Sequence, residues 1–341
     1  MRVKTAVVGV GLHGQNHALL YADDPDSELV LVCDADAARA AEVADRFKCR
    51  ATDRLQDVLH SDAQAVSVAT PDAMHFDPAI ALLRAGKHVL LEKPMTTSVE
   101  QAEALVDAAE LAGVNLMVNF SQRWNPKHLA VRERILAGDL GEILIGYARL
   151  SNDLSVPRQM LRWSTKSGPE WFLFPHSMDA VTWLIGQAPR EVFATGIKGV
   201  NRAEGRDIYD AIQAQVRYDT AVVTFETAWV LPEGGPRVAD SLYHLVGSRG
   251  WTSASADDGV YGMTSNAAGL RALDTITLAR PNAYGKVVGF YFDSIRHFVE
   301  SVGAGSKPLV TGRDGLLNVR MIAATLESIR TGAVVSIGPV G

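Results

Sequence analysis

A glycine-rich turn near the start of the chain constrains the fold more than any other feature. Residues 5–10 form a short apolar and β-branched run, and Gly9, Gly11 and Gly14 lie where this run gives way to a helix-like segment. Glycines at this spacing suit a strand, a tight turn and a helix whose first turn lets backbone approach a bound anion closely. The N-terminal part is therefore expected to begin with a nucleotide-binding strand-turn-helix unit.

An acidic residue closes the second apolar run at the place such a unit requires. Residues 29–33 are apolar, and Asp34 follows them, twenty residues after Gly14. A carboxylate here accepts hydrogen bonds from ribose hydroxyls and repels a 2′-phosphate, and residues 35–36 offer no arginine to receive one. The pattern predicts NAD as the cofactor in preference to NADP. Asp34 also fits the cap of the following helix, a role compatible with ribose binding.

Apolar runs alternate with helical segments up to about residue 120. Strands are expected at 5–10, 29–33, 65–69, 88–91 and 114–120. Helices are expected from the glycine turn to about residues 23–25, and at about 36–47, 73–85 and 99–112. Continuous apolar strands separated by helices indicate a parallel sheet covered on both faces. The pattern predicts an α/β, doubly wound domain over residues 1–120.

The pattern changes in residues 121–341, where strand-like runs follow one another with few helices between them. Strands are expected at 143–149, 191–197, 211–217, 221–227 and 243–246, helices at 177–185, 293–302 and 314–330, and a loop at 254–269. Such runs predict a C-terminal α+β domain with an open, mainly antiparallel sheet.

Charge and cysteine content exclude several classes of protein. The 33 lysines and arginines are outnumbered by 39 acidic residues, a net charge of −6, so neither nucleic acid nor a membrane surface is an expected partner. No apolar stretch is long enough to cross a bilayer, and the N-terminus lacks a signal-peptide cleavage site, so we expect a cytoplasmic protein. Cys33 and Cys49 form neither a disulfide framework nor a metal-binding pattern, and no metal site is expected.

Two further motifs make the chain resemble the Gfo/Idh/MocA family of glucose-fructose oxidoreductases and inositol dehydrogenases. They are Ala69-Thr70-Pro71-Asp72 with His75, and the segment 85–94 that ends in Glu92-Lys93-Pro94. Matches continue at Arg123-Trp124-Asn125-Pro126 and at His176-x-x-Asp179. The resemblance implies a Rossmann domain that binds NAD over residues 1–120. It also implies that residues 121–341 bind a carbohydrate or polyol substrate and form a homodimer or homotetramer.

The resemblance also implies roles for individual residues. Lys93 matches the catalytic lysine, whose ammonium group lowers the cost of negative charge on the reacting oxygen, and His176 matches the catalytic histidine. The first turn of a helix favours the neutral imidazole that a base needs. Cofactor contacts are expected from Gly9, Gly11, Leu12, His13, Gly14, Asp34, Thr70, Pro71, His75, Glu92, Lys93 and Gln122. Substrate contacts are expected from Lys93, Arg123, Asp153, Trp163, His176 and Asp179.

The chain departs from the family just before this histidine. Phe172 and Phe174 stand where most dehydrogenases of the group carry an aspartate and a glycine. Either His176 acts with Lys93 alone, or Asp153 or Asp179 replaces the aspartate, or the reaction is not the usual net oxidation. The favoured function is NAD-dependent hydride transfer at a secondary alcohol or ketone carbon of a sugar, polyol or glycoside. A redox-neutral NAD-dependent glycosidase and a non-catalytic nucleotide-binding regulator remain alternatives.

Overall fold

The chain folds into two compact units. The computed structural model describes residues 2–161, 167–235, 237–255, 260–263, 270–273, 280–281 and 285–339. One unit contains Met1–Trp124 with Leu278–Val319, and the other contains Asn125–Thr277 with Arg320–Gly341. The first unit thus includes a late segment that the sequence analysis assigned to the domain 121–341. No helix of the described residues is long and apolar enough to span a membrane.

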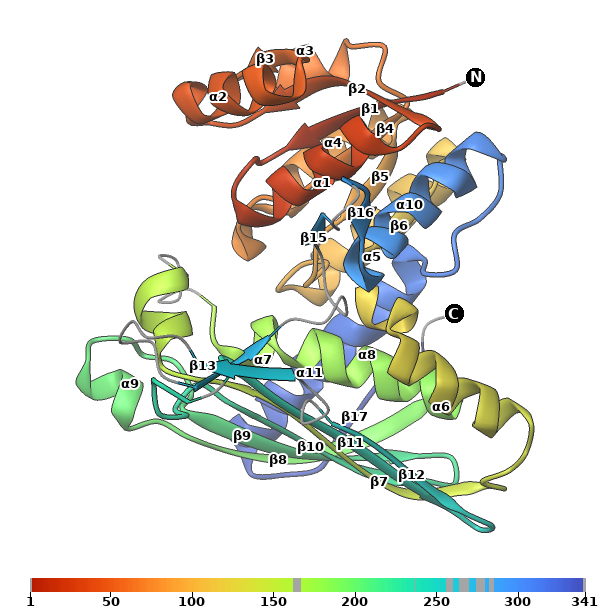
Figure 1. Ribbon diagram of the computed structural model, residues 1–341. Coiled ribbons are helices and arrows are strands. Elements are labelled where there is room, and N and C mark those ends of the chain that lie inside the picture. Colours follow the sequence, from red (N-terminus) through yellow and green to blue (C-terminus); the bar gives the residue numbers. More distant parts are fainter. Residues whose placement is uncertain are drawn as a thin grey trace. The chain divides into compact units, whose positions relative to one another are not determined.

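The first unit is built on a six-stranded, entirely parallel sheet (Figure 1). Its strands are β1 (Val3–Val8), β2 (Ser27–Cys33), β3 (Arg50–Thr52), β4 (Ala65–Val68), β5 (His88–Leu91) and β6 (Leu116–Val118). Its helices are α1 (Leu12–Asp23), α2 (Ala37–Phe47), α3 (Leu55–Leu59), α4 (Phe76–Arg84), α5 (Val99–Ala112) and α10 (Phe290–Gly303), with a short β15–β16 pair (Arg280–Pro281 and Val287–Val288). The order β3-β2-β1-β4-β5-β6 is that of a Rossmann fold, and the predicted doubly wound sheet is confirmed.

Strand order reverses between β1 and β4, and this position determines where a ligand binds. The strands of such a sheet are covered by helices, and every residue of β4 and β6 is buried. The loops after neighbouring strands β1 and β4 leave on opposite sides of the sheet, which opens a crevice at the carboxyl ends of the strands. The loops that carry the glycines, Asp34, Thr70 and Lys93 all follow carboxyl ends of these strands.

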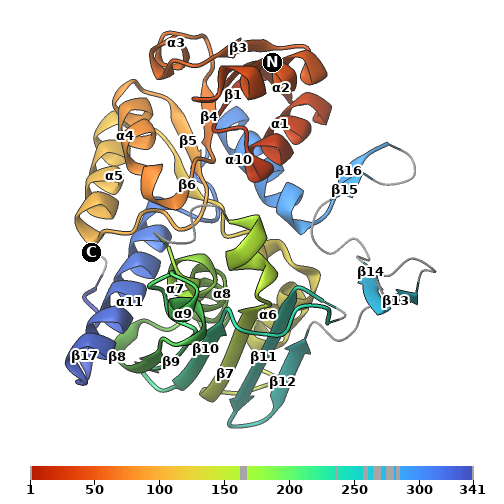
Figure 2. The same ribbon diagram turned by 90° about the vertical axis from the view of Figure 1, so that its left-hand side faces the viewer.

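The second unit has a seven-stranded sheet in the order β12-β11-β7-β10-β9-β8-β17 (Figure 2). The strands are β7 (Ile143–Asn152), β8 (Pro189–Ile197), β9 (Ala211–Tyr218), β10 (Val222–Ala228), β11 (Ala239–Gly247), β12 (Trp251–Ser255) and β17 (Val335–Ser336). Only β10 and β7 pair in parallel among the neighbours in this sheet, so the predicted open, mainly antiparallel sheet is confirmed.

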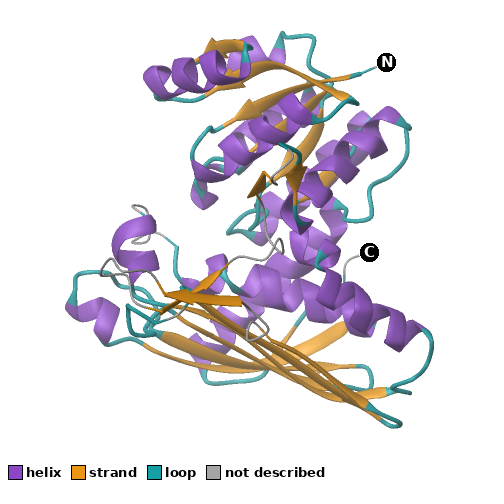
Figure 3. Ribbon diagram, in the orientation of Figure 1, coloured by secondary structure: helices purple, strands orange, loops and turns teal. Residues whose placement is uncertain are grey.

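Helices cover one face of this second sheet (Figure 3). They include α6 (Pro126–Leu136), α7 (Pro169–Phe172), α8 (Phe174–Ile185), the second half of α11 (Gly312–Thr331) and the short α9 (Val200–Ala203). A π-helical turn occupies Val156–Met160, and β13 (Val260–Met263) pairs with β14 (Leu270–Leu273). Inward-facing residues such as Val223 and Phe225 are fully buried beneath the helices.

The predicted loop at 254–269 is partly wrong. Residues 254–255 end β12, and Val260–Met263 form β13. Residues 256–259 and 264–269 of the predicted loop lie outside the described residues. Small and polar residues suggested a turn, but an edge strand with one exposed face also accepts them. The helix expected at 177–185 begins earlier, at Phe174, and ends at Ile185 as expected; Gly186, with a φ of +67°, caps it.

Candidate functional site

The three glycines of the first loop are required for different reasons. Gly9 has a φ of +83°, and a Cβ there would lie 2.8 Å from the backbone of Ala69 and Thr70. A Cβ on Gly14 would lie 1.8 Å from the carbonyl oxygen of Gly9. Gly11, in contrast, has no atom within 4 Å of the position its Cβ would take. The fold therefore needs Gly9 and Gly14, whereas the space at Gly11 fits the close approach of a ligand.

The helix behind this loop begins without a side-chain cap. Gly11 caps α1, and the first turn carries no acidic residue. Amide groups at a helix N-terminus that no side chain caps attract an anion, because the N–H groups and the helix dipole both favour negative charge. The loop thus fits the pyrophosphate of a dinucleotide.

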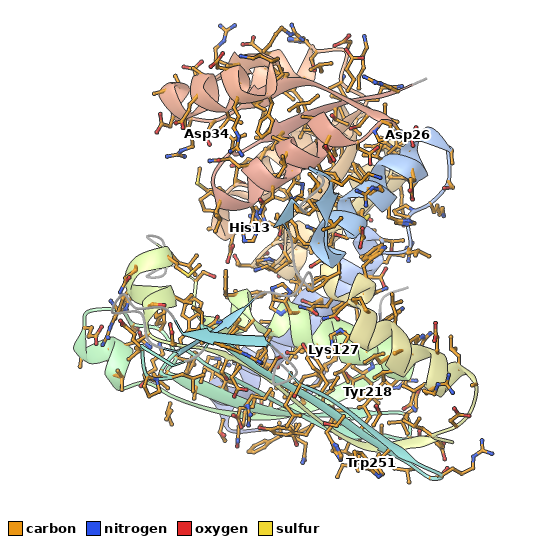
Figure 4. The ribbon with its side chains drawn as sticks, viewed as in Figure 1. His13, Asp26, Asp34, Lys127, Tyr218 and Trp251 are labelled. Atoms are coloured by element: carbon orange, nitrogen blue, oxygen red, sulfur yellow. The ribbon has the colours of Figure 1, made fainter. Side chains whose placement is uncertain are left out.

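Asp34 is held in place by the backbone around it. Its Oδ2 accepts a hydrogen bond from the Val10 amide at 2.8 Å, and its Oδ1 accepts one from the Asp36 amide at 2.9 Å. The Arg39 guanidinium also lies 3.3 and 3.4 Å from the two carboxylate oxygens. This arginine lies beyond residues 35–36, where none was found in the sequence, and the first turn of α2 brings it back to Asp34. Asp34 and His13 are labelled in Figure 4.

The loop after β4 is fixed to the segment after β5 by His75. The ring nitrogens of this buried histidine lie 2.7 Å from the carbonyl oxygen of Pro94 and 2.8 Å from that of Thr70. Thr70 in turn donates its hydroxyl to the carbonyl oxygen of Met74 at 3.1 Å. Pro71 begins the 3-10 turn Asp72–Met74. These contacts give His75 a structural role, and its contact with a cofactor stays a prediction.

Lys93 is buried beside two carboxylates. Burial lowers the pKa of Lys93, and the negative charges of Asp72 and Glu92 act in the opposite direction. Lys93 follows β5, so it lies at the same edge of the sheet as the glycine turn. An ammonium group with this setting can stabilise negative charge that develops on a substrate oxygen.

Four other residues of the first unit were predicted to contact the cofactor or the substrate. His13 lies 3.2 Å from the Tyr291 hydroxyl, and burial lowers the pKa of His13. Arg123 forms an ion pair with Asp314 at 2.8 Å, which ties the turn after β6 to α11. Gln122 is half-buried in that same turn, whereas Leu12 is exposed at the start of α1.

In the second unit, His176 lies half-buried in the first turn of α8. Phe172 packs against Trp229, with ring centroids 5.5 Å apart, in a cluster with Leu150, Val156, Leu173 and Ile208. The position of the family's aspartate is therefore part of an apolar core. Asp179 is buried, and its charge adds to burial in raising the pKa of Tyr218 and of Tyr243. This effect places Asp179 near two tyrosines of the sheet.

Two predicted substrate contacts remain, Asp153 and Trp163. Asp153 accepts hydrogen bonds from the amide and the hydroxyl of Ser155, so it stabilises the turn that leads into the π-helical segment. Trp163 lies outside the described residues. Glu170 was missed: it is buried in α7, and burial raises the pKa of its carboxyl group. A charged residue directly before the apolar run 171–175 was the signal for it.

A parallel sheet in this order, with an open glycine turn and a fixed acidic residue after β2, defines a dinucleotide-binding protein. The chain belongs to the Gfo/Idh/MocA oxidoreductase family: residues 3–120 match its NAD-binding Rossmann fold, and residues 132–337 match its C-terminal alpha/beta domain. The protein is thus an oxidoreductase with NAD as its cofactor.

Relatives with assigned activities cover nearly the whole chain. Scyllo-inositol 2-dehydrogenase (NADP(+)) of Bacillus subtilis (strain 168) is 26% identical, over 96% of this chain and 93% of the relative. Inositol 2-dehydrogenase of Rhizobium meliloti (strain 1021) is 27% identical, over 96% and 97%. A solved levoglucosan dehydrogenase, in complex with NADH and levoglucosan, has the same fold, with a TM-score of 0.84 at 22% identity over 99% of this chain and all of the other.

Proposed function

We propose that the protein is an NAD-dependent dehydrogenase or reductase that acts on a secondary alcohol or ketone carbon of a sugar or polyol. The cofactor part of this proposal rests on the open space at Gly11 and on the start of α1, whose amide groups no side chain caps. The names of the two inositol dehydrogenases support the substrate class, and cyclic polyols are therefore the first compounds to test.

Different residues of the chain bind the cofactor, stabilise charge and accept the proton. Gly9, Gly11 and Gly14 with the start of α1 hold the pyrophosphate, and Asp34 holds the adenosine ribose. Bound NAD supplies the two-electron acceptor. The Lys93 ammonium group stabilises negative charge on the reacting oxygen, and His176 takes up the hydroxyl proton. Residues 121–341 supply the remaining substrate contacts, with Asp153, Trp163 and Asp179 as candidates.

One observation is also compatible with a second function. Phe172 fills an apolar cluster where most family dehydrogenases carry a carboxylate, so the proton chemistry at His176 differs from theirs. A redox-neutral glycosidase, in which transient oxidation acidifies the neighbouring carbon and elimination expels the aglycone, tolerates such a change. A non-catalytic regulator is less well supported, because both Lys93 and His176 are retained.

A panel of inositols, sugars and glycosides incubated with NAD tests the proposal. Absorbance of the reduced nicotinamide reports net oxidation, and product mass reports aglycone release. Net oxidation of one compound class supports a dehydrogenase, and aglycone release without net reduction supports the glycosidase. Lys93→Met and His176→Ala are the controls, each expected to lower kcat roughly 10²–10⁴-fold, the usual effect of a positioned acid-base group. Binding of NAD with no turnover of any compound would contradict the enzyme assignment.

A further inference from the structure

A buried polar cluster surrounds Glu92, the residue before Lys93. Glu92 is an expected cofactor contact, but no role has been assigned to the residues that bind it. Glu92 precedes Lys93, and its Oε1 accepts hydrogen bonds from Asn119 Nδ2 at 2.7 Å and from the Tyr291 hydroxyl at 2.8 Å. His17 Nε2 lies 3.0 Å from the same oxygen. Glu92 Oε2 accepts a hydrogen bond from the Lys93 amide at 3.2 Å. Three separate segments, α1, the loop after β6 and α10, thus converge on one carboxylate.

The donors to Glu92 are themselves held in orientation. His17 is fully buried, and its Nδ1 lies 2.8 Å from the Ser67 hydroxyl, which in turn lies 2.6 Å from the Tyr21 hydroxyl. The other ring nitrogen, Nε2, lies 3.0 Å from both Glu92 Oε1 and the Tyr291 hydroxyl. The Ser294 hydroxyl donates to Asn119 Oδ1 at 2.6 Å, so the amide NH₂ group faces the carboxylate. The position of Glu92 is therefore fixed from several sides.

A second carboxylate is attached to the Lys93 segment through His75. Asp72 is buried in the 3-10 turn Asp72–Met74, and the ring of His75, directly after this turn, contacts the carbonyl oxygen of Pro94. The turn that carries Asp72 is thus linked to the residue after Lys93. Asp72 and Glu92 are therefore two buried carboxylates on different loops, each linked to the segment around Lys93.

The electrostatics agree with this geometry. Burial alone would raise the pKa of Glu92, but the hydrogen bond from His17 and the positive charges around it hold the pKa well below its usual range. The hydrogen-bond donors around Glu92 thus favour its ionised form. Asp72 and Glu92 favour the charged form of Lys93. His13 of α1 also faces Lys93, whose charge acts to lower the pKa of His13, and His13 and His17 both face Glu92.

We infer that Glu92 and Asp72 are positioning residues that keep the Lys93 side chain an ammonium ion inside a buried site, with His17, Asn119 and Tyr291 fixing Glu92. Without them, a lysine buried to this degree loses its charge readily, because a low-dielectric setting disfavours the protonated amine. The catalytic meaning of this arrangement rests on the proposed function, since it matters for turnover only if Lys93 acts on a substrate oxygen. The charge of Lys93 itself does not depend on the substrate.

Acetylation of Lys93 by acetic anhydride over a pH series, followed by peptide mass spectrometry on the intact folded chain, tests the inference. The midpoint of the pH dependence reports ionisation, and the plateau reports access of the reagent. Glu92→Gln and Asp72→Asn each remove a negative charge and should move the midpoint to lower pH. At a fixed pH below the midpoint, acetylation relative to the plateau should rise at least about threefold. Glu92→Asp, which keeps the charge, should restore the wild-type midpoint.

Asp24→Asn is the matched control. Asp24 is equally buried in the same unit, but it pairs with Arg296 at 3.0 Å at the other end of α1, so the midpoint of Lys93 should not move. Circular dichroism identifies any variant that does not fold, and Asp72→Asn still tests the inference if Glu92→Gln is lost. Unchanged midpoints in the folded charge-removing variants, or an equal shift in Asp24→Asn, would overturn it. Because neither substrate nor cofactor is present, a failure of the substrate panel leaves this result unaffected.

Discussion

The glycine loop shows that residues of one type can be required for different reasons. Gly9 and Gly14 are needed because a side chain would collide with backbone atoms, whereas the space at Gly11 is open. Gly11 has a φ of −70°, a value that other residues adopt without strain. The proposed contact with the pyrophosphate would account for this glycine, and the difference can be measured.

Gly11→Ala should leave the free energy of unfolding nearly unchanged but lower NAD affinity at least about tenfold, because the added methyl group occupies the space that the pyrophosphate needs. Gly14→Ala should instead destabilise the fold by about 1–3 kcal/mol, the usual cost of overpacking. Urea unfolding and calorimetric titration with NAD give the two quantities. Equal loss of stability in both variants, or unchanged NAD affinity in Gly11→Ala, would contradict this account.

Sequence reasoning found the site residues that local motifs mark, and it missed those that depend on distant partners. The glycines, Asp34 and Lys93 each follow a recognisable strand. The contact between Glu92 and Tyr291 joins residues 199 positions apart, and no spacing rule predicts it. Glu170 was missed for a related reason, because its burial depends on how α7 packs in the second unit.

At the scale of single elements, helix α2 modifies the specificity expected from Asp34. Asp36 caps this helix by accepting hydrogen bonds from the amides of Ala38 and Arg39. The cap places the Arg39 side chain beside both Asp34 and Asp36, and a guanidinium nitrogen of Arg39 donates to Asp36 Oδ2 at 3.2 Å. A guanidinium group here partly neutralises the carboxylate that we expect to disfavour NADP, and it offers donors to a phosphate.

Calorimetry should show tighter binding of NAD than of NADP, because the Asp34 carboxylate repels a 2′-phosphate. Arg39→Ala should raise the ratio of the NADP Kd to the NAD Kd by a further factor of roughly ten. NADP would lose the charge-assisted hydrogen bonds of the Arg39 guanidinium, while NAD keeps its contact with Asp34. Arg46→Ala, which changes an arginine in the last turn of the same helix, is the control and should leave the ratio unchanged. Wild-type NADP binding as tight as NAD binding would refute the predicted preference.

Long apolar elements could be predicted, and short or edge elements could not. The expected strands around β1, β2, β4 and β5 coincide with buried runs, where hydrophobicity alone identifies a strand. The three-residue β3 and the amphipathic α6 lack such a run and were missed. β12 and β13 are strands because they pair with β11 and β14, and a local sequence pattern does not reveal such pairing.

At the scale of the whole molecule, the face of the second sheet opposite the helices carries an apolar row. Register places Trp251, Val246, Ile145 and Val222 side by side on β12, β11, β7 and β10. Trp251 is 68% exposed and Ile145 is 56% exposed. Figure 4 labels Trp251 at this part of the sheet. Exposed apolar rows of this kind mark protein interfaces, which supports the expected homodimer or homotetramer.

Light scattering at micromolar concentration should therefore show an oligomer, and Ile145→Glu should shift it toward the monomer, because a buried unpaired charge is costly at an interface. Leu111→Glu on α5 is the matched control: Leu111 is 92% exposed in the first unit, and its replacement should leave the mass unchanged. A monomeric wild-type protein, or equal dissociation by both variants, would show that this face is not the interface.

Transfer of a hydride from a carbohydrate or polyol carbon to NAD is the step on which every proposed role depends. The compound from the panel that turns over fastest, labelled with deuterium at the carbon that is oxidised, tests it directly. Mass spectrometry should find the deuterium in the released, reduced dinucleotide, and Lys93→Met should slow its appearance while NAD affinity stays close to that of the wild type. Deuterium that stays in the sugar product, with no label in the dinucleotide, would contradict the assignment as a net dehydrogenase.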